Sequence, residues 1–151
     1  MSQLDAFLRW CHPDLLTERL RHSAACWQLL QTLELEPEHC PPPPAGSVSL
    51  IPWCGRQLAL TSSVQADPQG RPPSFSLLAD SASFWVFALL EPEGDDPPDP
   101  LNRQHWRVWL VPARQLHPER RSIALQPLTR AHGDGMAWDA LAAALSVAIQ
   151  R

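Results

Sequence analysis

The chain has 151 residues, a hydrophobic share of 44% and a formal net charge of −4, values typical of one soluble globular domain over residues 1–151. All twelve basic residues are arginines, which excludes the lysine chemistry of phosphate-binding loops, Schiff bases and lysine-assisted hydrolysis. No stretch reaches the roughly 20 apolar residues that cross a bilayer. The first residues lack a signal-peptide pattern, so we expect a cytoplasmic protein without membrane contact.

The chain begins with a helical pattern. A helix is predicted over residues 5–33, broken or bent near His12-Pro13. Its apolar residues recur at helical spacing and are Leu15, Leu16, Leu20, Ala24, Trp27, Leu30 and Leu33. Residues 34–46 then form a loop that four successive prolines make stiff and extended.

The middle of the chain, residues 47–125, is predicted to supply the strands of one sheet. The run Phe84–Leu90 (FWVFALL) has no polar residue, so we expect a central strand covered on both faces. Residues 126–135 are predicted as loop or short helix, and residues 136–150 as a closing helix. This order of elements predicts an α/β fold. The other predicted strands are residues 47–53, 57–64, 75–78, 106–111 and 120–125.

No motif in the sequence predicts a metal or a cofactor. The four cysteines are widely spaced without a C-x-x-C pair, so we expect free thiols. The acids within residues 34–38 and 91–99 lack the ligand pattern of a calcium loop and are expected to be solvated. No G-x-S-x-G motif occurs, and Ser62 and Ser63 lie on a predicted strand. A Ser–His–acid arrangement elsewhere stays open.

Basic and aromatic residues concentrate in the last third of the chain. Residues 101–151 carry a net charge of +4, whereas residues 1–100 carry −8. The basic part could pair with the acidic part within the fold, or it could face an anionic partner. We expect Arg107 to point away from the tryptophans that flank it on a predicted strand. The candidate partner or nucleic-acid surface consists of Arg103, Arg107, Arg114, Arg120, Arg121, Trp106 and Trp109.

Three segments between Ser74 and Leu128 follow one another in a distinctive order: FWVFALL, then WRVWLVP, then RSIAL. This order resembles the C-terminal half of small restriction-endonuclease-like proteins of the PD-(D/E)XK superfamily. The helical segment around Arg21 is similar to the first helix of that family. Residues 47–63, predicted as a hairpin with its turn at Cys54-Gly55-Arg56, are similar to the family's metal-binding hairpin. The resemblance implies a single-domain α/β/α sandwich with a central mixed sheet.

The chemistry of that family needs an Asp and a Glu to hold Mg²⁺ and a Lys to position the attacking water. In this sequence, Ala59 and Thr61 match the E-x-K motif of the family. The acid of the family's first helix falls at Cys26, and the hairpin aspartate falls near Ser49. No carboxylate occurs within residues 41–65. The resemblance therefore implies no catalytic residues, no metal and no cofactor.

These observations predict a catalytically inactive restriction-endonuclease-like domain that acts as a protein-binding or assembly module. A protein partner or a second copy of the chain is expected, and DNA bound without cleavage is a variant of this function. Two alternatives stay open. One is a small acidic chaperone-like binding protein. The other is an active metal-dependent nuclease whose acids have moved to Glu34, Glu36, Glu38 or Asp67.

Overall fold

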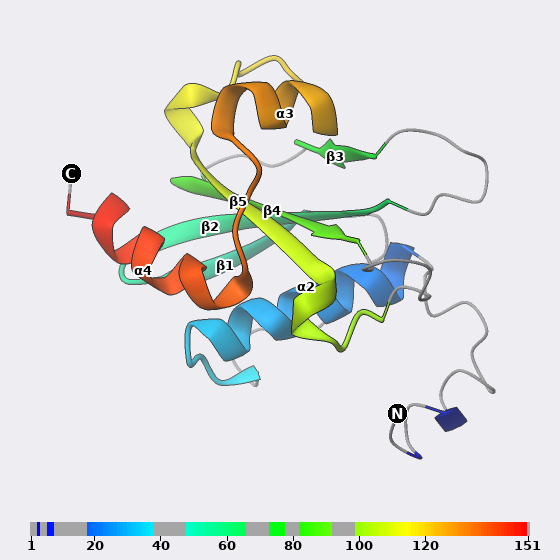
Figure 1. Cartoon of the computed structure of the whole chain (residues 1–151). Helices are drawn as coiled ribbons and strands as arrows, with labels where there is room; N and C mark the ends of the chain where they lie inside the picture. Colours follow the sequence, from blue (N-terminus) through cyan, green and yellow to red (C-terminus); the bar gives the residue numbers. More distant parts are fainter. Residues whose placement is uncertain are drawn as a thin grey trace.

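The computed structural model describes residues 3, 6–7, 18–37, 48–65, 73–77, 82–91 and 99–150. These residues form a mixed α/β structure in three layers (Figure 1). A four-stranded sheet lies in the middle. Helices α2 (Glu18–Thr32) and α4 (Trp138–Ala148) cover one face, and helix α3 (Leu125–His132) with a two-stranded sheet covers the other. The α/β class predicted from the sequence is confirmed. None of the described helices is long and apolar enough to span a bilayer.

Along the chain, helix α2 precedes the strands, and helices α3 and α4 follow them. Most of the loop predicted at 34–46, and the start of the helix predicted at 5–33, fall on residues that are not described. In chain order the elements are α2 (Glu18–Thr32), β1 (Ser49–Trp53), β2 (Arg56–Val64), β3 (Ser74–Ser76), β4 (Phe84–Leu90), η2 (Arg103–His105), β5 (Trp106–Pro112), η3 (Ala113–Gln115), β6 (Ser122–Ala124), α3 (Leu125–His132) and α4 (Trp138–Ala148).

The central sheet is mixed, with the strand order β1-β2-β4-β5. The predicted hairpin β1–β2 is antiparallel, and its turn uses positive φ angles of 49° at Cys54 and 74° at Gly55. Strand β4 runs parallel to β2, and β5 returns antiparallel to β4. The second sheet pairs β3 with β6.

Strand β4 forms the wall between two hydrophobic cores, and all seven of its residues are buried. Its even-numbered residues, such as Val86, pack toward α2 and α4. Its odd-numbered residues, such as Phe87, pack toward β3, β6 and α3. Successive side chains of a strand point to opposite faces, so an uninterrupted apolar run is what a strand covered on both sides requires. The prediction of a central strand covered on both faces is confirmed.

Both edge strands of the central sheet, β1 and β5, have features that limit hydrogen bonding to a further strand. On β1, Pro52 has no backbone N–H to donate. On β5, Val108 exchanges backbone hydrogen bonds with Met136, at 2.8 and 2.7 Å between the nitrogen and oxygen atoms. Strand edges that carry proline or a covering segment resist unplanned strand addition.

The apolar stripe predicted on α2 is confirmed in part, because its members Ala24 and Leu30 are buried. Leu20 and Trp27, placed by the sequence on the apolar stripe, have exposed fractions of 37% and 45%. The sheet instead covers the face that carries His22, Cys26 and Leu29, which follow one another at spacings of four and three residues. The buried face of α2 therefore shares only part of the predicted stripe.

Candidate functional site

Four positions match the metal-site residues of the resembled family, and only two of them meet. Cys26 on α2 and Ser49 on β1 are in contact, with Sγ 3.4 Å from Oγ. Ala59 and Thr61 are both buried on β2. Ala59 packs in the core below α3, and Thr61, two residues along the strand, points to the same side. The sheet therefore separates the E-x-K positions from Cys26 and Ser49.

A histidine that the sequence analysis did not single out lies beside Cys26 and Ser49. His22 is one helical turn before Cys26 on α2, and only 2% of it is exposed. Its Nδ1 lies 3.0 Å from Ser62 Oγ on β2, and its Nε2 lies 2.9 Å from Ser49 Oγ on β1. Burial, with the positive charge of Arg21 as the second cause, lowers the pKa of His22 from 6.5 to about 4. The imidazole is therefore neutral at pH 7.

This cluster contains a base and hydroxyl groups, but not the set of groups that a serine nucleophile needs. A neutral imidazole accepts a hydrogen bond at one nitrogen and donates from the other. Nucleophilic catalysis also needs a third group that orients the base, usually a carboxylate. Here a hydroxyl occupies each ring nitrogen, and β1 and β2 contain no acid. We conclude that the cluster joins α2 to the β1–β2 hairpin.

The acids of the relocated-site alternative do not come together in the described part of the chain. Glu34 and Glu36 are exposed just after α2, whereas Glu38 and Asp67 fall outside the described residues. No group of three or more His, Cys, Asp or Glu side chains among the described residues could hold a metal ion.

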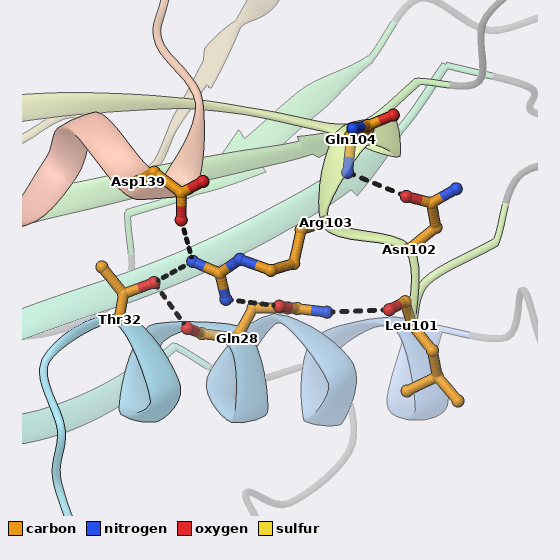
Figure 2. A network of polar contacts seen from close by, with 7 residues as sticks. All are labelled: Gln28, Thr32, Leu101, Asn102, Arg103, Gln104 and Asp139. Carbon is orange, nitrogen blue, oxygen red and sulfur yellow. Dashed lines mark hydrogen bonds and ion pairs between the residues drawn. The ribbon is translucent and has the colours of Figure 1, made fainter.

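Arg103, which the sequence placed on the partner surface, instead joins three elements of the fold (Figure 2). Its Nη1 donates to Gln28 Oε1 at 2.8 Å. Its Nη2 donates to Thr32 Oγ1 at 2.8 Å and to Asp139 Oδ1 at 3.0 Å. Gln28 donates in turn to the backbone carbonyl oxygens of residues 100–101. Arg103 thus connects η2 with α2 and with the first turn of α4, which is an internal structural role.

Arg107 on β5 also has partners within the fold. Its Nη2 donates to Glu91 Oε2 at 2.8 Å, and its Nη1 donates to the backbone oxygen of Asp134 at 3.1 Å. Its guanidinium carbon lies 5.1 Å from the centre of the Trp109 ring. The expectation that Arg107 points away from both neighbouring tryptophans is therefore wrong for Trp109, because residues two apart on a strand share a face.

The prediction that Trp106 and Trp109 lie on a partner surface is wrong. They are core residues, with exposed fractions of 4% and 1%. Each indole Nε1 donates to a backbone oxygen, from Trp106 to Pro100 at 2.8 Å and from Trp109 to Gly133 at 2.9 Å. These bonds satisfy the polar atom that makes buried tryptophan costly.

The remaining arginines of the predicted surface, Arg114, Arg120 and Arg121, are exposed. Together with the exposed Arg130 they belong to residues 113–132, which build the layer of β6 and α3. The ion pairs found among described residues are those of Arg103 and Arg107 and involve none of these four. We call Arg114, Arg120, Arg121 and Arg130 the arginine surface. Glu119 is the single acid in residues 113–132.

No protein-family model matches the chain, and comparisons with curated proteins and with solved structures gave no match.

Proposed function

We propose that the chain is a non-catalytic binding module that holds an anionic partner on its arginine surface, and that duplex DNA is the partner to test first. The observation that carries this proposal is that four arginines within residues 113–132 are exposed and make no ion pair with a described acid. Guanidinium groups bind phosphate oxygens in a bidentate geometry. Neutralising the phosphates of DNA also releases the counterions condensed on it. A relation to restriction-endonuclease-like domains, which the sequence resemblance implies, is part of the same proposal.

The non-catalytic character is supported by the residue types at the positions that the resemblance assigns. Ala59 and Thr61 carry neither a carboxylate nor an amine, and both are buried. Cys26 Sγ donates a hydrogen bond to Ser49 Oγ, and both residues are part of the contact between α2 and the hairpin. A magnesium ion prefers carboxylate oxygens and water, and these four side chains offer no carboxylate.

The first prediction concerns salt dependence. The full chain should bind a short DNA duplex with an affinity that falls as salt concentration rises. The double variant Arg120→Ala with Arg121→Ala should reduce the slope of log affinity against log salt by about 2, because each phosphate-contacting arginine contributes roughly one. Fluorescence anisotropy titrations at several salt concentrations measure this slope.

Arg56→Ala is the matched control for this experiment. Arg56 is also exposed, but it lies at the start of β2, outside residues 113–132, with its guanidinium carbon 5.8 Å from the centre of the Phe84 ring. Its loss should leave the slope unchanged. No binding at low salt, or an equal effect of Arg56→Ala, would remove the DNA proposal. Plasmid cleavage with Mg²⁺ that Glu36→Ala abolishes would favour the nuclease alternative.

Assembly with a second copy of the chain is the second candidate function, and the exposed face of α2 favours it. Leu20 and Trp27 lie two helical turns apart on that face, and exposed tryptophan is a frequent interface anchor. If this face joins two copies, Trp27→Gln should raise the dimer dissociation constant about tenfold or more in sedimentation equilibrium. Val147→Gln, at an exposed apolar position of α4, is the control. A chain that stays monomeric at every concentration contradicts this candidate.

A further inference from the structure

The contact around His22 has an unusual position in the fold. One buried ring joins α2 to both strands of the hairpin, through Ser49 on β1 and Ser62 on β2. The thiol of Cys26 donates to the same Ser49 oxygen, so a second α2 side chain takes part. The attachment of α2 to the hairpin therefore includes a group that can take up a proton.

Protonation changes what this contact can do. A protonated imidazole donates from both nitrogens, so the hydroxyl that had donated to the ring must turn and accept instead. Protonation also places a positive charge in a buried site, and a buried charge is costly unless it is paired.

The charged side chains that the structure describes on the elements around His22 do not favour a cation there. Arg21, the neighbouring residue on α2, acts against it. Strands β1 and β2 contain no acid, and their one charged residue, Arg56, begins β2. The acid of α4, Asp139, is bound to Arg103. On α2 itself, Glu18 lies four residues and Arg19 three residues before His22.

We propose that the His22 contact is a pH switch: it holds α2 on the β1–β2 hairpin while the ring is neutral, and it releases α2 locally, ahead of the sheet, when the ring is protonated.

The size of the effect follows from the two protonation states. Burial lowers the pKa of His22 from 6.5 to about 4 in the attached helix, and release restores the ordinary value. Between these values the released state binds more protons than the attached state, so acid favours release. The stabilising contribution is complete above pH 6.5 and is lost as pH falls to about 4. At pH 5 the population of the released state should be about 20-fold larger than at pH 7.

Native-state hydrogen exchange of the full chain in low urea tests this proposal, after correction for the intrinsic rate at each pH. Amides of α2 should exchange through an opening that depends weakly on urea and is about 20-fold more populated at pH 5 than at pH 7. Amides of β4 should exchange through a separate, strongly urea-dependent opening. The proposal is overturned if α2 and β4 share one opening at both pH values.

His22→Gln provides the matched variant, since glutamine keeps a hydrogen-bonding side chain that does not titrate in this range. In this variant the population of the α2 opening should be the same at pH 5 and pH 7, and retained pH dependence contradicts the proposal. Because this variant can fail to fold, an NMR titration of the unaltered chain is the second measurement. One histidine ring should titrate near pH 4, and titration of every ring near 6.5 also contradicts the proposal.

Discussion

Gly135→Ala should lower the free energy of unfolding by about 3 kcal/mol, because the new methyl group meets both a strained backbone and a filled space. Gly135 has φ +85°, a conformation that residues with a side chain rarely adopt. A Cβ there would lie 2.7 Å from Arg107 Cγ, 2.9 Å from Trp109 Cε2 and 3.0 Å from the Val108 backbone oxygen. The last atom is the acceptor in the pairing of β5 with Met136, so it has little freedom to move.

Gly133→Ala separates the two causes. Gly133 has φ +82°, but no heavy atom lies within 4 Å of the position that its Cβ would take. This variant should lose only the backbone part, about 2 kcal/mol, because φ 82° with ψ −163° is a conformation that essentially only glycine adopts. Urea unfolding followed by tryptophan fluorescence measures both variants. Equal losses would show that the close approach of Gly135 to β5 does not exist in solution.

Arg103→Met should destabilise the fold by about 2–3 kcal/mol, since it removes three hydrogen bonds and leaves a buried amide oxygen without its donor. The acceptor that would lose its donor is Gln28 Oε1, and the Gln28 side chain is buried on α2. By contrast, Asp139→Asn should cost less than about 0.5 kcal/mol, because an exposed ion pair contributes little. The side chain of Asp139 is 86% exposed. Thermal and urea unfolding of both variants give the comparison.

Arg103→Lys is the control for geometry in the same experiment. Arg103 uses two guanidinium nitrogens to reach acceptors on α2 and α4, and a single ammonium group does not reproduce that fork. Lysine should therefore recover less than half of the lost stability. Full recovery, or a loss in Asp139→Asn as large as in Arg103→Met, would show that the positive charge and not the shape of Arg103 is what stabilises the fold.

The sequence predicts those parts of the fold whose patterns are local. The hairpin follows from the turn at Cys54-Gly55 between two predicted strands, and both turn residues have positive φ angles. The uninterrupted apolar run of β4 predicts burial on both faces, because a strand with one solvent-exposed face would alternate polar and apolar residues. Neither inference needs knowledge of a distant partner.

The roles of single side chains are predicted less well, because their partners are far away in the sequence. Arg103 is 75 positions from Gln28 and 71 from Thr32 in the sequence. No sequence pattern near Arg103 predicts either contact. His22 was missed for a similar reason, since Ser62 is 40 positions away. The spacing of His22 and Cys26, four residues apart on a helix, was a usable signal. It marks the buried face of α2 more truly than Leu20 and Trp27 do.

The protected edges of the central sheet restrict how copies of this chain can associate. Growth of a fibril or of a continuous intermolecular sheet needs a row of free main-chain donors and acceptors at an edge. Pro52 interrupts that row on β1. On β5, the main-chain groups of Val108 are already paired with Met136. Self-association of the described part of the chain is therefore expected to rely on side-chain surfaces, and to produce closed and soluble complexes more readily than amyloid-like polymers.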